Sequence, residues 1–179
     1  MCLMKINEAQ YLLVVDTLRI PDAKMQCAQE NQTWEPLYLG TDWQPQLENS
    51  PIWVSVTPHD SLWQLWENDQ TWATSAVLFA YSTRQDLHEI VKSLQNNITA
   101  PCEDGRLFLL RFYSPYTLSV IAKYGDETVT NAVLGVAHSA YLSPLISQDY
   151  GVSTIQHTRI STQKTQLSLP SALIEELLQ

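Results

Sequence analysis

Several apolar runs in this sequence are too short to form buried helices, and they constrain the fold more than any other feature. Residues 11–16 (YLLVVD), 51–56 (PIWVSV) and 75–81 (SAVLFAY) are the clearest, and residues 36–40 (PLYLG) and 106–113 (RLFLLRFY) are two more. Runs of this length that stay apolar at successive positions predict strands. Where a strand is apolar throughout, both faces of its sheet are expected to be covered.

Segments with helical periodicity separate these strands. Residues 59–69 place their large apolar side chains on one face, and residues 87–94 repeat apolar side chains at i, i+3, i+4 and i+7. Residues 23–28 have the same spacing, and Pro115 fits the first turn of a further helix. We therefore predict an α/β fold in which a mixed or mostly parallel sheet of about five strands carries helices on both faces.

The texture of the sequence changes after Gly125, where polar and small residues mix. Weak alternation over residues 153–162 predicts an edge strand. Leucines at i, i+4 and i+8 near the end predict a short amphipathic helix that starts at Pro170, and these are Leu169, Leu173 and Leu177. We divide the chain into a core domain, 1–125, and a C-terminal extension, 126–179. The apolar stripe of the last helix would cover either the protein's own sheet or a partner's groove.

The charge of the chain excludes some classes of partner. Ten basic and nineteen acidic residues give a formal charge of −9, the wrong sign for phosphate contacts, so we expect no nucleic-acid partner. No run approaches the roughly 18 apolar residues of a membrane span, and the first ten residues lack the pattern of a secretory signal. We expect a cytoplasmic protein without a membrane partner. Its cysteines, Cys2, Cys27 and Cys102, are far apart and are expected to be reduced thiols.

The motifs of common catalytic and cofactor sites are missing from the sequence. Only five glycines occur, and none form the glycine-rich loops that cradle nucleotide phosphates. The four histidines are scattered without metal-ligand spacing, and no G-x-S-x-G motif is present. We therefore assign no catalytic residue, no metal and no cofactor, and expect a protein that is not an enzyme.

All six tryptophans lie between Trp34 and Trp72. Tryptophan is enriched at interface hot spots and at sugar-stacking platforms, because it combines a large rigid face with one hydrogen-bond donor. Most of the six are expected to belong to the core, with Trp53 buried in its strand. Trp43, Trp63 and Trp66 are the candidates for partner binding, with Trp43 the most exposed of them.

Arg111 is unusual because it interrupts the apolar segment DGRLFLLRFYSP, which covers residues 104–115. A guanidinium is always charged and is costly to bury without a partner. It could tie a strand end to backbone carbonyls or to an acid such as Asp16 or Asp104. Alternatively it could open onto a binding groove and accept a partner's carboxylate beside the Tyr113 ring. The sequence leaves both possibilities open.

These segments resemble a bacterial family of type VI secretion effector chaperones, also called adaptors. The resemblance covers about residues 11–124: an apolar strand that ends in Asp16, then the segment LYLG, then a strand opened by proline, then DGRLFLLRFYSP after a helix. The motif positions that match are Asp16, Gly105, Arg106, Arg111 and Pro115. Ser114 stands where the family usually has Asp, so that position offers Arg111 no carboxylate.

The resemblance implies a non-enzymatic function. Such a chaperone binds a secreted toxin effector in the producing cell and helps to load it onto the spike protein at the tip of the secretion tube. Two other classes remain alternatives. A carbohydrate-binding module would stack sugars on Trp43 or Trp63, and an enzyme with an unrecognised site would need Asp16, Asp42, His59 or Arg111 to converge in a pocket.

Overall fold

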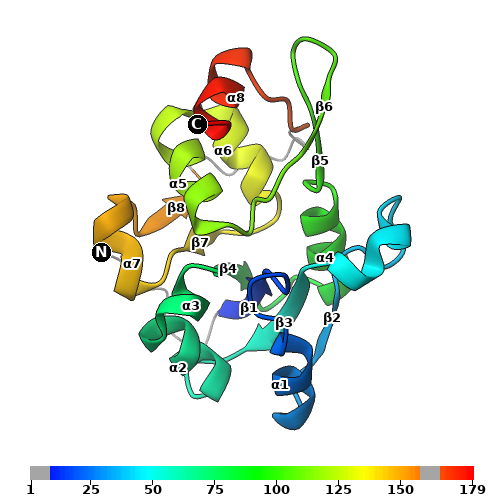
Figure 1. Ribbon diagram of the computed structural model, residues 1–179, viewed down its shortest axis with the longest axis vertical. Coiled ribbons are helices and arrows are strands. Elements are labelled where there is room, and N and C mark those ends of the chain that lie inside the picture. The colour runs from blue at the N-terminus through cyan, green and yellow to red at the C-terminus, as the bar shows by residue number, and fades with distance from the viewer. Residues whose placement is uncertain (1–8, 158–165) are drawn as a thin grey trace.

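A six-stranded sheet forms the centre of the computed structural model, which describes residues 9–157 and 166–179 (Figure 1). The spatial order of the strands is β2-β3-β1-β4-β7-β8, and every neighbouring pair is antiparallel. Their bounds are β1 Ala9–Val15, β2 Trp34–Pro36, β3 Ile52–Val56, β4 Ala76–Ser82, β7 Ser139–Tyr141 and β8 Thr154–Gln156. A separate two-stranded hairpin pairs β5 (Thr99–Pro101) with β6 (Leu107–Leu109).

The predicted mostly parallel sheet of about five strands is therefore wrong. Helices do connect β3 to β4, and these two strands run parallel to each other, because each is antiparallel to β1. However, β1 lies between them and pairs with both. Alternation along the chain shows that strands are separated by helices, but it does not show which strand is inserted between two others.

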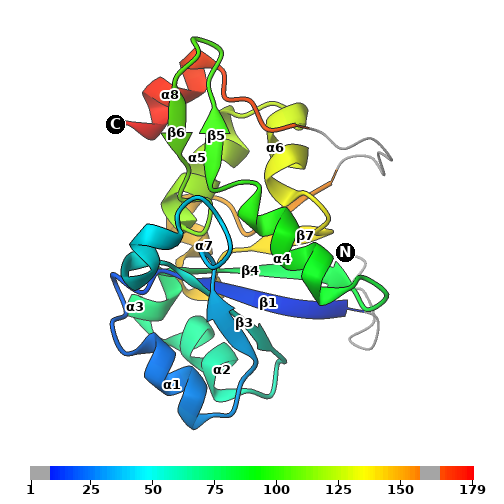
Figure 2. The same ribbon diagram turned by 90° about the vertical axis from the view of Figure 1, so that its right-hand side faces the viewer.

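One face of the sheet, here called the α2 face, is covered by three helices, which lie below the sheet in Figure 2. They are α1 (Ala23–Gln29), α2 (Ser61–Asn68) and α3 (Gln70–Ala73). Leu13 and Val15 from β1 lie in this core with Leu62 and Trp66 from α2. The alternation of β1 sends its other side chains, such as Leu12 and Val14, to the opposite core.

That opposite face, the α4 face, is covered by a larger group of elements drawn above the sheet in Figure 2. They include α4 (Leu87–Gln95), α5 (Pro115–Tyr124), α6 (Glu127–Leu134) and α8 (Ser171–Leu177), while α7 (Pro144–Tyr150) contacts α2 and α3 instead. The helix predicted over residues 87–94 agrees with α4, whose Ile90 and Leu94 are buried. Among the described helices, none is long and apolar enough to cross a bilayer.

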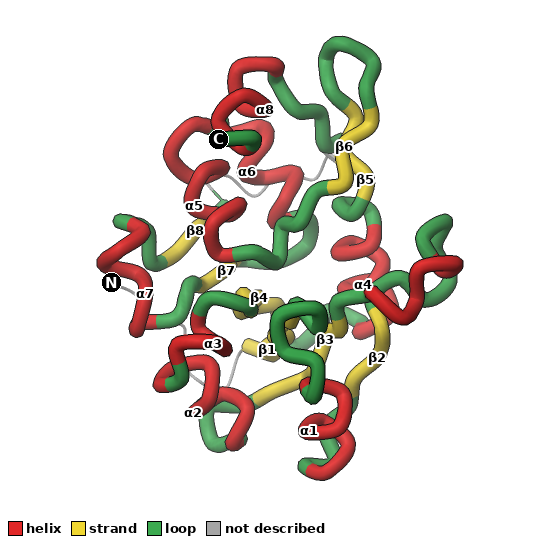
Figure 3. Tube along the Cα trace, in the orientation of Figure 1, coloured by secondary structure: helices red, strands yellow, loops and turns green. Residues whose placement is uncertain are grey.

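Two predicted strands take a different form. Residues 37–40 form turns rather than a strand. Gly40 has a φ of +74°, a left-handed backbone conformation that residues with a side chain rarely adopt. Figure 3 shows the long connection that follows, with the 3-10 helix η1 (Gln44–Asn49) in it. The strand expected over residues 106–113 ends at Leu109, because Leu110 and Phe112 turn into the core while Arg111 stays at the surface.

The C-terminal residues pack with the rest of the molecule. On either side of Gly125, buried residues belong to one cluster, which contains Leu12 and Phe79 as well as Val133 and Leu173. The last helix therefore places its apolar stripe on the protein's own core, through contacts with α5. β8 lies at the edge of the sheet, while residues 158–162 of the predicted edge strand lie outside the described residues. The division into 1–125 and 126–179 stays a prediction.

Candidate functional site

Arg111 pairs with Asp16, which the end of β1 places beside it. The Arg111 Nη2 donates to Asp16 Oδ2, across 95 positions of sequence. Asp16 is also fixed by the backbone: its N–H donates to the Ser75 carbonyl (2.9 Å), and its Oδ1 accepts from the Leu18 N–H (3.0 Å). The Asp16 side chain is 5% exposed and that of Arg111 is 46% exposed. The carboxylate is thus part of the interior, and the guanidinium reaches the surface.

Electrostatics keep the guanidinium charged. Partial burial by itself lowers the pKa of Arg111, but the charge of Asp16 and the Tyr113 hydroxyl outweigh this effect, so that the pKa is raised. The Arg111 Cζ also lies 5.9 Å from the centroid of the Tyr113 ring, within the range of a cation–π contact. Because one donor goes to Asp16 and half of the side chain is exposed, other donors of Arg111 are available to a partner.

Aromatic side chains continue from Arg111 toward the hairpin. Burial raises the pKa of the Tyr113 hydroxyl, Tyr38 raises it further, and Arg111 opposes both, with a net upward direction. The Tyr38 ring lies 6.0 Å from that of Trp43, whose indole N–H donates to Thr99 Oγ1 (2.8 Å). Tyr113 is 4% exposed and Tyr38 5%, so both support the site from below, while Trp43 is half-buried.

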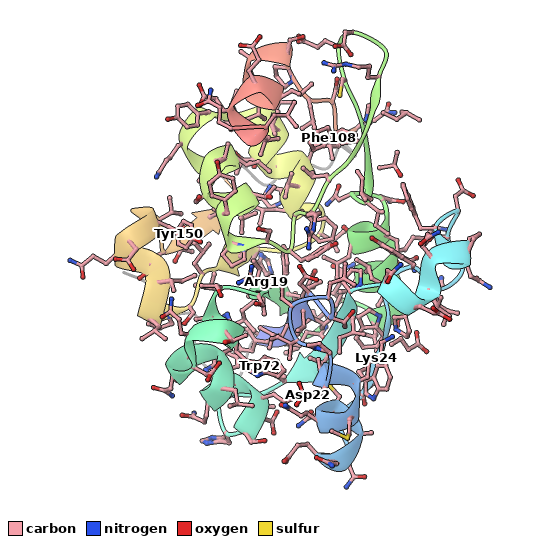
Figure 4. All side chains as sticks on the ribbon, in the orientation of Figure 1. Arg19, Asp22, Lys24, Trp72, Phe108 and Tyr150 are labelled. Carbon is pink, nitrogen blue, oxygen red and sulfur yellow. The ribbon has the colours of Figure 1, made fainter. Side chains whose placement is uncertain are left out.

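A buried serine holds Tyr38 in place. Ser50 is fully buried; its Oγ accepts from the Tyr38 N–H (2.9 Å), and its carbonyl accepts from Thr17 Oγ1 (2.7 Å). At the end of α4, the Gln95 side-chain amide donates to the Leu37 carbonyl (3.0 Å). Beside Asp16, the Arg19 side chain donates to Ser75 Oγ (2.8 Å), and Figure 4 labels Arg19 near the centre of the molecule. These bonds tie the loop after β1, the connection between β2 and β3, the residue before β4 and the end of α4 to one end of the sheet.

The structure brings some of the candidate residues together and separates others. Trp43, Arg111 and Tyr113 belong to one site, on the side of the α4 face. Trp63 and Trp66 lie on α2, on the opposite face. Trp66 is 3% exposed and donates to the Ala76 carbonyl (3.2 Å), so it is a core residue.

Trp63 remains half-buried on that opposite face. Its ring stacks edge-on against Tyr11 at 5.0 Å, and its indole donates to Glu67 (2.8 Å). Trp53 is buried as predicted, at 3% exposure. An open groove of about 840 Å³ also runs along this side between α1 and α2, and Asp22, Met25 and Leu65 are among its lining residues.

The other motif residues shape the backbone. Gly105 has a φ of +87°, a left-handed conformation that suits glycine in the hairpin turn. Arg106 pairs with Asp104 (2.7 Å) at the exposed tip, so it does not compete with Arg111 for Asp16. Pro115 is the first residue of α5, and the Ser114 side chain accepts from the Thr117 N–H. Serine is therefore the N-cap of this helix.

Sequence reasoning missed the residues that connect the site. Tyr38 was placed in a strand, whereas it lies in a turn and contacts both Trp43 and Tyr113. The segment LYLG, which contains Tyr38, did indicate this region, since it is one of the segments that resemble the effector chaperones. Ser50 and Thr99 gave no such signal, because a single hydroxyl residue carries no local pattern that marks its partner. Within the described part of the chain, no group of three or more His, Cys, Asp or Glu could hold a metal ion.

Comparisons with known proteins assign the family. The sequence model described as Domain of unknown function (DUF4123) matches residues 11–132, more than half of the chain. The protein belongs to this family. Searches among curated proteins and among solved structures each find no significant match. The matched range includes Asp16, Arg111, Tyr113 and Pro115, and it ends within α6.

Proposed function

We propose that this protein is a non-enzymatic chaperone, or adaptor, of a type VI secretion system. It binds a secreted toxin effector in the cytoplasm of the producing cell and promotes loading of that effector onto the spike protein. The observation that carries this proposal is the segment DGRLFLLRFYSP in its family context, within a match that covers residues 11–132. The family description gives no function, so the assignment rests on the resemblance of these segments to effector chaperones.

The geometry around Arg111 is consistent with a surface that recognises protein. A guanidinium held at one end by a buried carboxylate has a fixed direction, so less side-chain entropy is lost when a partner binds. Arginine, tyrosine and tryptophan are the residues most enriched at binding hot spots. Here Arg111 and Trp43 are partly accessible, and the buried Tyr113 and Tyr38 lie beneath them. A partner carboxylate or main-chain carbonyl would suit the remaining Arg111 donors.

The test is coexpression with the toxin encoded beside this gene and with the spike protein of the same cluster. We expect the toxin to co-purify with the full-length protein and the spike protein to join that complex. Arg111→Gln should weaken toxin binding, and Arg84→Gln is the matched control, because Arg84 is an exposed arginine in the turn after β4.

Melting temperatures of both variants separate lost binding from lost folding. If toxin and chaperone are each recovered alone at micromolar concentration, the proposed function is wrong. If Arg111→Gln binds the toxin as wild type does, the function stands but the site lies elsewhere.

A further inference from the structure

The β5–β6 hairpin has one backbone edge that is not paired with any part of the described chain. In its ladder, the Leu110 N–H donates to the Ile98 carbonyl (2.9 Å), and the Cys102 N–H donates to the Arg106 carbonyl (2.8 Å). Hydrogen-bonded positions alternate along an antiparallel strand with positions whose N–H and C=O point away. Leu107 and Leu109 are those intervening positions. Their outward N–H and C=O groups have no hydrogen-bond partner within residues 9–157 and 166–179.

The other edge of the same hairpin is partly covered. The Leu169 N–H donates to the Pro101 carbonyl (2.9 Å), and the Leu169 carbonyl accepts from the Glu103 N–H (3.2 Å). This short parallel bridge, just before α8, pairs the β5 side at its end near the turn. The hairpin projects at the top of the molecule in Figure 1 and Figure 2, with α8 beside it. The β6 side has no such bridge among the described elements, whereas on the β5 side only Thr99 keeps outward backbone groups without a backbone partner there.

The side chains on β6 do not protect its edge. Leu107 is 73% exposed and Leu109 is 40% exposed, whereas Phe108 between them packs against the core, and Figure 4 labels it on the side of the helices. Natural proteins block open edges with lysine, proline, bulges or inward charges. β6 has none of these, and the nearby Arg106 is held by Asp104; the one such device it has is its short length of three residues.

We propose that β6 accepts an extended segment of the toxin effector as an added strand. The outward N–H and C=O groups of Leu107 and Leu109 would pair with that segment, whose apolar side chains would lie on the two leucines. The identity of the partner rests on the proposed function, while the mode of binding rests on the hairpin alone.

The edge continues directly into the candidate site. Thr99 lies opposite Leu109 in the hairpin, so their side chains share one face, and Thr99 also accepts the Trp43 indole N–H. Two residues beyond Leu109, Arg111 reaches the surface. A bound strand would therefore run toward Arg111, while Trp43 lies across the hairpin, on the β5 side.

A second copy of the chain fits this edge less well than a different protein does. Two copies would each have a formal charge of −9 and would repel each other. A three-residue strand is also a small contact, whereas a stable specific interface buries about 1,200 Å² or more. A toxin segment of neutral or basic character avoids the repulsion and can extend beyond β6 toward Arg111.

The test compares full-length variants in binding to the toxin encoded beside the gene. Leu107→Pro removes an outward donor without removing a ladder hydrogen bond to β5, a position at which edge strands tolerate proline. We expect it to weaken binding about tenfold, the effect of losing one well-made hydrogen bond and its packing. Leu109→Ser should also weaken binding, and Leu145→Ser on α7, which is 43% exposed, is the matched control.

Residue-resolved amide exchange supplies the readout specific to strand addition. The Leu107 and Leu109 amides should exchange rapidly in the free protein and become protected in the complex, while the Leu110 amide is protected in both. Normal toxin binding by Leu107→Pro overturns this inference alone. A wild-type dimer that Leu107→Pro converts to a monomer also overturns it, because the occupant is then a second copy. No toxin binding by the wild-type protein overturns the proposed function together with this inference.

Discussion

The pair between Asp16 and Arg111 can be tested through the free energy of unfolding. Arg111→Ala removes the guanidinium and leaves the Asp16 carboxylate, 5% exposed, with the Leu18 N–H as its one remaining hydrogen-bond donor among the described residues. Asp16→Asn removes the charge and keeps an oxygen that can still accept from that N–H. The two single variants and the double variant form a cycle that isolates the interaction between the side chains.

The magnitude follows from the unequal burial of the two partners. Breaking a fully buried pair costs about 3–5 kcal/mol, whereas exposed pairs contribute about 0.2–1 kcal/mol. Solvent screens the Arg111 end, which is 46% exposed, so the buried-pair value must be reduced. We expect Arg111→Ala to cost about 2 kcal/mol, with a coupling of about 1 kcal/mol in the cycle. For a chain of this size the melting temperature would fall by about 4–8 °C.

Urea unfolding at pH 7, analysed by linear extrapolation, measures these differences. Arg106→Ala is the control, because the pair of Arg106 with Asp104 is exposed at the hairpin tip, and its melting temperature should match that of the wild type. A melting temperature of Arg111→Ala that equals that of Arg106→Ala would refute the reasoning, and so would additive effects in the cycle. Toxin binding lost without loss of stability would assign Arg111 to recognition alone.

Three further predictions concern the core. Tyr81→Phe should raise the melting temperature by a few degrees, because the buried Tyr81 hydroxyl has no hydrogen-bond partner among the described residues. Leaving such a hydroxyl unpaired costs about 1–3 kcal/mol of stability, and a clear loss of stability in Tyr81→Phe would show that the hydroxyl is satisfied. Burial raises the pKa of the Cys27 thiol to about 11, so Cys27 should resist iodoacetamide at pH 8 until urea unfolds the chain, and rapid labelling of the native protein would contradict this burial. A fragment of residues 1–125 should aggregate, because it lacks β7 beside β4 and exposes the core that Val133 and Leu173 cover; a soluble fragment with cooperative melting would instead support a separate core domain.

The sequence predicts local elements better than their pairing. β1, β3 and β4 fall on apolar runs, and α4 on its helical spacing, because burial on one or both faces leaves a local pattern. Strand direction leaves no such pattern, and the pairing of β1 with both β3 and β4 depends on contacts far apart in sequence. The helices α6 and α7 were missed because small and polar residues dilute their periodicity.

The candidate site, too, could be predicted from local features but not from contacts between distant segments. The unusual position of Arg111 could be inferred locally, and Asp16 was one of two acids named for the arginine. Trp43 was expected to be the most exposed candidate, but it is half-buried, as Trp63 is. The hydroxyl of Thr99 that receives the Trp43 indole depends on how the connection after β2, in which Tyr38 also contacts Trp43, meets β5 across the fold. Trp66 shows the converse error: its aromatic character suggested recognition, but its place on the inner face of α2 makes it core.

Ser114 shows why the structural role of a motif position can persist when its residue changes. The resembling family usually has Asp there, and both Asp and Ser accept hydrogen bonds from the backbone at a helix N-terminus. In this protein Ser114 has that role at the start of α5, and the acid that pairs with Arg111 is Asp16, 95 positions away. The serine therefore leaves both features intact: the cap needs only a side-chain oxygen, and the ion pair takes its carboxylate from the end of β1.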